Sequence, residues 1–279
     1  MKKIKIIFIL ISFSSAIGLK SLLIPLDAIS MASSNTGIAQ TSSVRINPAI
    51  ISNQNYHLIS TSLNSWLGDI NGNVVSYSWD NNYAYINSYK VEDIELWGSV
   101  PGNDPVASLS MRWLNIAYGH GMVYQNNVSL GVELNAIYSR LYSKTTSGLL
   151  INLGMIYSFG ESLKVGSIFK NYGYLESDLN ENYPSEFGFG LAYNFNFPFS
   201  IKLDYIQNES IGNIYRSSAD IQFGHFTLIC GLSNHKSNQF LSGGIQLDYR
   251  SWSINYSILS QDVSTLGTPY SIQLTKKLN

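Results

Sequence analysis

The sequence has few charged residues. Of its 279 residues, only 13% are Asp, Glu, Lys or Arg, whereas 45% are hydrophobic, and the formal net charge is -1. An average soluble protein carries about 25% charged residues, many of which keep its outer surface hydrated. The shortage argues against a soluble β-protein with a solvated exterior. The near-neutral charge also argues against a nucleic-acid partner, which would favour a basic patch.

Motifs for catalysis and for cofactor binding are absent as well. The sequence has no Gly-x-Ser-x-Gly elbow, P-loop or dinucleotide fingerprint. His57, His120, His225 and His235 are too scattered to suggest the three or four ligands of a zinc site, and Gly119-His120-Gly121 resembles a turn. A surface lipase would need Ser, His and an acid on one barrel face, and nothing singles out such a set. We therefore expect no enzyme, no metal and no cofactor.

Cysteine is nearly absent too. Cys230 is the only one, which excludes an intramolecular disulfide, and no cysteine lies near the N-terminus to carry a lipid anchor.

The N-terminus has the pattern of an export signal. Lysines at positions 2, 3 and 5 precede an apolar stretch from Ile6 to Phe13, and Ser14-Ser15-Ala16 offers a small-residue cleavage site. A transmembrane anchor is the alternative, but a spanning helix needs about 20 apolar residues. We expect residues 1–16 to be a cleaved signal peptide. No later segment has the length and apolarity of a spanning helix.

Strict alternation of side chains dominates the second half of the chain. Between positions 187 and 197 the odd positions are all Phe, Leu or Tyr, and the even positions are Gly, Ala or Asn. Because a strand turns successive side chains to opposite faces, this segment has one bulky apolar face and one small or polar face. The pattern recurs to the C-terminus. Behind an export signal, it predicts a closed antiparallel barrel with lipid outside and small or polar side chains inside.

The alternation marks fifteen candidate strands in residues 56–279, which we expect to form the barrel domain. Bacterial barrels of one chain have even strand numbers, so we predict about fourteen strands, with twelve or sixteen as alternatives. The candidates are Tyr56–Trp66, Asn73–Trp79, Tyr83–Tyr89, Ile94–Val100, Ala107–Tyr118, Val128–Tyr138, Leu149–Phe159, Leu163–Phe169, Phe187–Phe197, Phe199–Tyr205, Arg216–Phe223, Phe226–Leu232, Phe240–Tyr249, Trp252–Leu259 and Tyr270–Thr275.

Loop lengths and the polar faces favour a membrane barrel over a soluble β-sandwich. Very short links alternate with longer ones, such as Asn208–Tyr215, and the polar stretch Asn171–Glu186 predicts a long extracellular loop. A sandwich would alternate in the same way, with its apolar face turned inward. However, the polar faces consist mainly of Gly, Ser, Asn and Ala, which suit a solvated exterior poorly.

Residues 17–55 precede the strands and are rich in Ser, Ala and Asn, with one short helix at most, around Ala28–Ser34. The segments Ile29–Ala39 and Arg45-Ile46-Asn47-Pro48-Ala49 resemble the N-terminal signature of the PorV/PorQ family. Members of that family are FadL-like outer-membrane barrels, and PorV and PorQ belong to the type IX secretion system. Echoes of the family occur at residues 66–71, 128–132, 151–154 and 266–274.

The resemblance implies that Asn47, Pro48 and Ala49 lie on an N-terminal segment packed in the lumen. The residues agree with a turn, because Pro fixes φ and Asn can bond the local backbone. An ordinary surface turn is the alternative. The sequence departs from the family pattern at Ala32-Ser33, where Gly-Gly is usual, at Gln40-Thr41, which replace an acidic pair, and at Ile46, which replaces an aromatic residue.

Several charged residues fall on the polar faces of the predicted strands. If the apolar faces contact lipid, these charges point into the lumen, where they could pair, hold the N-terminal segment or line a solute path, with rim positions as the alternative. Asp204 and Asp220 have the most apolar flanks and are expected to lie deepest. The set comprises Glu133, Lys164, Lys202, Asp204, Asp220 and Asp248.

These observations lead to two functional hypotheses. The first is a bacterial outer-membrane accessory of protein secretion or surface attachment, whose partners are membrane lipid and secretion proteins or their cargo. The alternative is a FadL-like channel whose partner is a hydrophobic small molecule. The sequence alone does not decide between them.

Overall fold

A computed structural model describes most of the chain beyond the predicted signal peptide, and residues 1–16 lie outside the described part. The described residues are 22–41, 43–54, 56–67, 69–96, 104–105, 107–141, 143–178, 184–236, 238–261 and 267–278.

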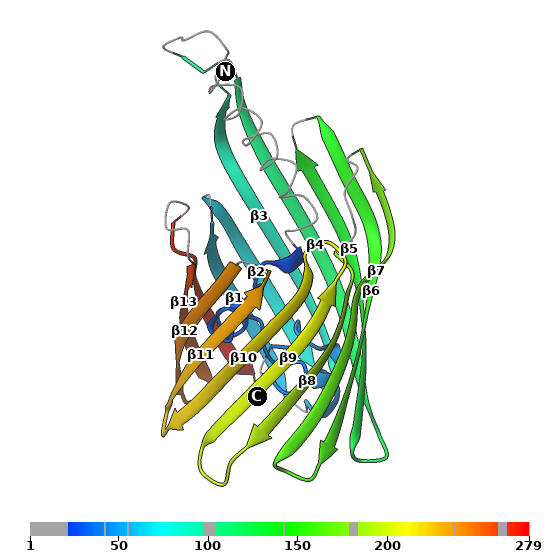
Figure 1. Cartoon of the computed structure of the whole chain (residues 1–279), viewed down its shortest axis with the longest axis vertical. Coiled ribbons are helices and arrows are strands. Elements are labelled where there is room, and N and C mark those ends of the chain that lie inside the picture. The colour runs from blue at the N-terminus through cyan, green and yellow to red at the C-terminus, as the bar shows by residue number, and fades with distance from the viewer. Residues whose placement is uncertain are drawn as a thin grey trace.

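Fourteen antiparallel strands form a closed barrel (Figure 1), which confirms the predicted fold class and strand number. Each strand pairs with the next in sequence, and β1 closes the ring by pairing with β14. The strands are β1 (His57–Trp66), β2 (Ile70–Trp79), β3 (Asn82–Leu96), β4 (Ala107–Tyr124), β5 (Val128–Leu141), β6 (Lys144–Phe159), β7 (Leu163–Ser177), β8 (Glu186–Asn194), β9 (Phe199–Asn208), β10 (Gly212–Phe223), β11 (Phe226–His235), β12 (Asn238–Tyr249), β13 (Trp252–Gln261) and β14 (Tyr270–Leu278).

The alternation of side chains in the sequence gives the barrel wall an exposed apolar outer face and a buried inner face of small or polar residues. In β8, Phe187, Phe189 and Leu191 are exposed, whereas Gly188 and Gly190 between them are buried. Exposed Ile, Leu, Val, Phe and Tyr side chains recur on the outer face of every strand. In water such a surface would be unfavourable, but in a bilayer it contacts acyl chains while the closed ring satisfies the backbone hydrogen bonds.

The structure has one strand fewer than the fifteen candidates, because two of the candidates belong to a single strand. Tyr83–Tyr89 and the start of the next candidate at Ile94 belong to the single strand β3, whose pairing with β4 shifts register between Val91 and Ile94. A β-bulge of this kind interrupts the alternation without ending the strand.

Two predicted loops proved to be strand. Residues Gly119–Gly121 lie within β4, and residues 171–177 of the expected extracellular loop continue β7. The continuation of β7 begins at a bulge, where Asn171 has a φ of 61° and donates its N–H to Asn152 Oδ1 at 2.6 Å. The link after Asn208 is also shorter than predicted, because β10 begins at Gly212.

The strands differ in length, and this makes the barrel wall uneven. β3 to β7 contain 14 to 18 residues, whereas β8 and β14 contain nine each. Figure 1 shows β3 to β7 rising beyond the other strands at one rim. At this same rim β3, β7 and β13 end and β4, β8 and β14 begin, and the opposite rim carries short turns such as Arg250-Ser251. In outer-membrane barrels the longer loops are extracellular and the short turns are periplasmic.

The described N-terminal residues include two short helices, α2 (Ala28–Ala32) and the 3-10 helix η2 (Pro48–Asn53). α2 contacts β11 to β14, and η2 contacts β3 to β6, so the segment touches opposite sides of the ring. Figure 1 shows it in blue among the strands, at the level of the lower half of the barrel. Among the described helices, none is long and apolar enough to cross a membrane.

Candidate functional site

Many polar contacts join the N-terminal segment to itself and to the inner wall of the barrel. Asp27 caps α2: its carboxylate accepts the Ser30 N–H at 2.7 Å, and the Ser30 hydroxyl accepts the Asp27 N–H at 3.2 Å. The same carboxylate accepts the Ser43 hydroxyl at 2.7 Å and lies 3.4 Å from Arg45 Nη1. Two stretches of the segment are thereby tied together by buried groups.

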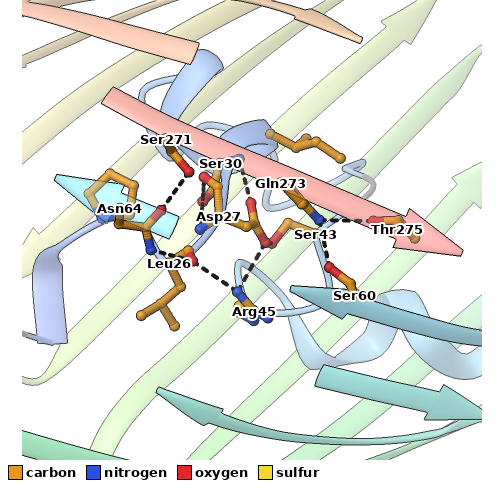
Figure 2. Close-up of polar contacts among 12 residues, drawn as sticks. Leu26, Asp27, Ser30, Ser43, Arg45, Ser60, Asn64, Ser271, Gln273 and Thr275 are labelled. Atoms are coloured by element: carbon orange, nitrogen blue, oxygen red, sulfur yellow. Dashed lines mark hydrogen bonds and ion pairs between the residues drawn. The ribbon is translucent and has the colours of Figure 1, made fainter. Parts of the chain in front are cut away.

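This network continues into the wall at the seam between β1 and β14 (Figure 2). Asn64 of β1 donates to the Leu26 carbonyl at 3.0 Å and accepts the Ser271 hydroxyl of β14. Close by, Gln273 donates to Ser60 Oγ at 3.0 Å. Because the Leu26 carbonyl accepts hydrogen bonds from Asn64 and from Arg45, the segment can lie against this wall without an unpaired backbone carbonyl at Leu26.

Asn47, Pro48 and Ala49 lie against the wall on the opposite side. Asn47 caps η2 by accepting the Ala49 N–H at 2.9 Å, and its amide donates to the Ile38 carbonyl at 2.6 Å. Pro48 occupies the first turn of η2, where its missing N–H costs nothing. Asn47 and Ala49 are fully buried. These residues therefore fix both the start of η2 and its distance from the Ile38 turn.

Glycines in the wall create the space for this contact, and sequence reasoning missed them. A Cβ at Gly131 of β5 would overlap the Pro48 backbone, and one at Gly154 of β6 would overlap the Asn47 side chain. Gly166 and Gly231 face the backbone of Ile38 and of Ser33 in the same way. In the sequence these glycines fall on the small-residue face of each strand. In the structure some of them are cross-strand partners, as Gly131 and Gly154 are.

Asp204 of β9 links the wall to the backbone of the segment. Its carboxylate accepts the N–H of Gly37 at 2.7 Å and that of Ile38 at 3.2 Å, and the side chain is buried. Two wall cations bind backbone carbonyls of the segment: Arg216 bonds Asn35 at 3.2 Å, and Lys170 bonds Arg45 at 3.1 Å. Charge-assisted bonds of this kind are about twice as strong as neutral ones.

The other predicted charges lie on the inner face in different surroundings. Glu133 is buried and accepts the Tyr83 hydroxyl at 2.5 Å and the Asn135 amide at 2.8 Å. Lys202 is buried and forms an ion pair with the partly buried Asp220. Asp248 accepts the Gln246 amide at 2.9 Å, and Lys164 is partly buried near the short-turn rim. Asp204 and Lys202 are both buried, whereas Asp220 is only partly buried.

Bulky aromatic and apolar side chains lie on the inner face of β3 and β4 beside Asn87 and Asn115, contrary to the expectation that bulky residues face lipid. Tyr89, Met111 and Trp113 pack with Ile24 and Ile70 in one buried cluster. Against this cluster lies a cavity of about 40 Å³ lined by Tyr85, Trp113, Arg45 and Lys170, among others. Two larger polar cavities, of about 370 and 420 Å³, lie toward the short-turn rim and share Ile29, Gln246 and Asp248. The lumen thus combines an apolar cluster on β3 and β4 with polar cavities at the short-turn rim.

No constellation for chemistry emerges in the described part of the chain. Within it, no three His, Cys, Asp or Glu side chains gather to hold a metal ion. His57 and His120 bond Tyr77 and Asn82 separately on the barrel surface. The candidate site instead has three parts. They are the N-terminal segment hydrogen-bonded to the wall, the apolar cluster of β3 and β4, and the polar cavities at the short-turn rim.

Comparison with known proteins finds solved structures of similar fold but no match to a family model or to a curated protein. The toluene transporter TbuX of Ralstonia pickettii has a TM-score of 0.70 at 12% identity, covering 92% of this chain and 99% of that chain. The toluene transporter TodX of P. putida has a TM-score of 0.69 at 11% identity, covering 91% and 98%. A Pseudomonas aeruginosa FadL homologue has a TM-score of 0.64 at 9% identity, covering 90% and 98%.

The chain is therefore a closed, fourteen-strand outer-membrane barrel with an apolar outer face. Its fold is similar to that of the toluene transporters TbuX and TodX and of the FadL homologue. The comparisons lend no support to the narrower resemblance to PorV and PorQ.

Proposed function

We propose that this protein is an outer-membrane channel for hydrophobic small molecules. The observation that carries the proposal is the apolar cluster on the inner face of β3 and β4, within a barrel of transport-protein fold. A lumen that only needed filling could use the Ser, Asn and Gly residues found on the inner faces of β12 to β14. Buried Tyr89, Met111 and Trp113 instead offer a surface with which an apolar solute can exchange contacts.

The N-terminal segment acts as the gate of this channel. With the segment in place, the cavity beside the apolar cluster measures about 40 Å³, which holds a few water molecules but no aromatic hydrocarbon. Passage of a solute therefore requires the segment to shift relative to the wall. The cost of that shift is set by three side chains of the wall: Asp204 accepts a backbone N–H of the segment, and Arg216 and Asn64 donate to its carbonyls.

The first experiment measures uptake of a labelled monoaromatic hydrocarbon or long-chain fatty acid by Gram-negative cells that lack their own channel for it. Cells making this protein should show saturable uptake above cells carrying an empty vector. Equal uptake by the two strains would refute the channel.

A reversible cross-link then tests the gate. The hydroxyl oxygens of Ser34 and Ser242 lie 2.7 Å apart, joining the end of the α2 region to β12. In a Cys230→Ser background, the double variant Ser34→Cys and Ser242→Cys should form a disulfide at this position. Oxidation should abolish uptake, and reduction should restore it.

The matched control places a cross-link within the wall. Thr146 of β6 and Ser177 of β7 also have hydroxyl oxygens 2.7 Å apart, and both residues belong to the wall. The variant Thr146→Cys and Ser177→Cys should take up solute equally well when oxidised and reduced. If both cross-links block uptake, or neither does, the segment is not the gate.

A role in protein secretion or attachment is the second candidate, with secretion proteins or their cargo as partners. It is favoured by the resemblance of residues 29–49 to PorV/PorQ and by the projecting rim of β3 to β7. Charged side chains on this rim, including Lys90, Glu92 and Arg112, give it a hydrated surface for a protein partner. The test is deletion of the gene in its host, followed by measurement of surface-displayed cargo; unchanged display would refute this role.

A further inference from the structure

The cavity beside the apolar cluster of β3 and β4 is lined by polar groups that the proposed channel does not yet use. It measures about 40 Å³, and four of its lining residues are at most 7% exposed. Each of the four has one polar side-chain atom without a hydrogen-bond partner among the described residues. These atoms are Arg45 Nε, Asn87 Oδ1, Trp113 Nε1 and Asn115 Oδ1. Because a buried polar group without a partner is unfavourable, a ligand that supplied partners here would be stabilised.

The strand register gathers these residues at one place on the inner wall. Asn87 of β3 is the direct partner of Asn115 of β4, and Trp113 is the next inward-facing residue along β4. Opposed residues of neighbouring strands have Cβ atoms about 5 Å apart, and inward-facing residues of one strand follow one another at about 7 Å. Arg45 approaches from the N-terminal segment, since its guanidinium carbon lies 4.9 Å from the centre of the Tyr85 ring. Tyr85 is the inward-facing neighbour of Asn87 along β3.

Two of the four atoms belong to donors and two are acceptors, and this composition selects the chemistry of the ligand. Arg45 Nε and Trp113 Nε1 carry N–H groups, whereas the amide oxygens of Asn87 and Asn115 accept. A hydroxyl group both donates and accepts, so it can bond to either kind. A carboxylate only accepts, and it would face two amide oxygens in a cavity that the buried Glu133 also lines. A hydrocarbon would leave all four atoms unpaired.

The rest of the lining suits an apolar body. Leu22, Leu26 and Ile137 border the same cavity, and Leu26 also packs against the apolar cluster. With the segment in place the cavity has room for a small polar group, and the body attached to that group needs the space that opens when the segment shifts. Since Arg45 belongs to the segment and Asn87 to the wall, a bound hydroxyl would contact both sides of the gate.

We propose that this cavity binds the hydroxyl group of a neutral amphipathic solute, such as an alkylphenol. The inference rests on the proposed channel function and names the class of solute that the channel prefers. The hydroxyl exchanges hydrogen bonds with the wall and with Arg45, while the apolar body contacts Trp113 and Leu26.

Equilibrium dialysis of the full detergent-solubilised protein against radiolabelled probes tests this selectivity. Propylbenzene, 4-propylphenol and 4-propylbenzoate share one apolar body and differ in the polar group. After correction for uptake by protein-free micelles, 4-propylphenol should bind at least about tenfold more tightly than either of the others. Equal binding of 4-propylphenol and propylbenzene would overturn the proposal, because water would then serve the four atoms equally well. Equal or tighter binding of 4-propylbenzoate would overturn it too, and would assign the cavity to Lys170, which also lines it.

Variants locate the hydroxyl. Asn87→Leu with Trp113→Phe removes one acceptor and one donor, and should weaken 4-propylphenol binding about tenfold while propylbenzene binding stays within about twofold. Asn87→Leu alone should weaken it about threefold, which keeps the test valid if the double variant does not fold. The matched control is Asn255→Leu, because Asn255 of β13 also has a buried amide oxygen that no described residue bonds, but it lines a different cavity. Wild-type affinity for 4-propylphenol in the double variant would overturn the proposal.

Uptake by cells separates this proposal from the channel on which it rests. If propylbenzene enters no faster than in cells carrying an empty vector, the channel is refuted, whatever the purified protein binds. If propylbenzene enters but the purified protein shows no preference for 4-propylphenol, the channel stands and the hydroxyl site is refuted.

Discussion

Gly131 of β5 and Gly154 of β6 lie opposite each other in the barrel wall, and both face the Asn47-Pro48 step of the N-terminal segment. A methyl group at either position would overlap atoms of the segment, and at Gly131 those atoms are backbone. The segment therefore packs so closely against the wall that neither position has room for one more carbon atom.

The substitution Gly131→Ala should loosen the segment from the wall. Overpacking of this kind costs about 1 to 3 kcal/mol, and the segment can relieve it by moving away. The measurement is tryptic cleavage after Arg45 in the detergent-solubilised protein, because this residue is buried in the wild type. Cleavage should be faster in the variant. The control is Gly243→Ala, where the nearest atom to a new Cβ is 3.8 Å away, and cleavage at the wild-type rate is expected there.

The side chain of Asn47 should matter more than its small size suggests. Asn47→Ala removes the cap of η2 and the bond to the Ile38 carbonyl, and each loss costs about 1 kcal/mol. Asn47→Ser keeps the ability to cap and should lose roughly half as much. The loss of stability in each variant is measured as the shift of its thermal unfolding midpoint in detergent, read from the gel mobility of the folded barrel. Identical midpoints for the two variants would mean that capping contributes nothing here.

Much of this fold could be predicted from the sequence, because alternation reports directly which face of a strand meets lipid. It worked best from β8 onward, where Phe187 to Tyr193 alternate with Gly and Ala on the inner face. It failed at β3, where tyrosines such as Tyr83 and Tyr85 face inward and are buried by the N-terminal segment. Alternation cannot distinguish lipid from a packed segment, since both accept bulky apolar side chains.

The candidate site was predictable in part for a similar reason. Charge on the inner face marked Asp204, but its partners are backbone N–H groups, which leave no trace in a sequence. Gly119 to Gly121 resembled a turn because glycine favours turns. In the structure, the inward-facing Gly121 instead allows η2 to come close, as a Cβ there would lie 2.6 Å from Ile51. Recognising that role requires knowing which segment passes the wall.

Asp204→Ala should release the Gly37–Ile38 turn. The carboxylate accepts two backbone N–H groups in a buried site, and its removal leaves both donors unpaired. We expect a loss of about 2 to 4 kcal/mol and rapid cleavage after Arg45. Asp248→Asn is the matched control, because Asp248 accepts its side-chain hydrogen bonds from Gln246 and not from the segment. Equal protection from trypsin in Asp204→Ala and wild type would show that other bonds hold the segment.

Two tyrosines offer a comparison between a charged and a neutral acceptor. Tyr83 donates to the Glu133 carboxylate at 2.5 Å, whereas Tyr85 donates to the Asn135 amide oxygen at 3.1 Å, and both rings are buried in the same cluster. Tyr83→Phe should cost about 1.5 to 3 kcal/mol, because a buried carboxylate loses one of its donors, and Tyr85→Phe should cost about 1 kcal/mol. Unfolding by urea in detergent micelles measures both. An equal or larger loss in Tyr85→Phe would show that Glu133 does not depend on the Tyr83 hydroxyl, and that its charge is balanced by its amide partners alone.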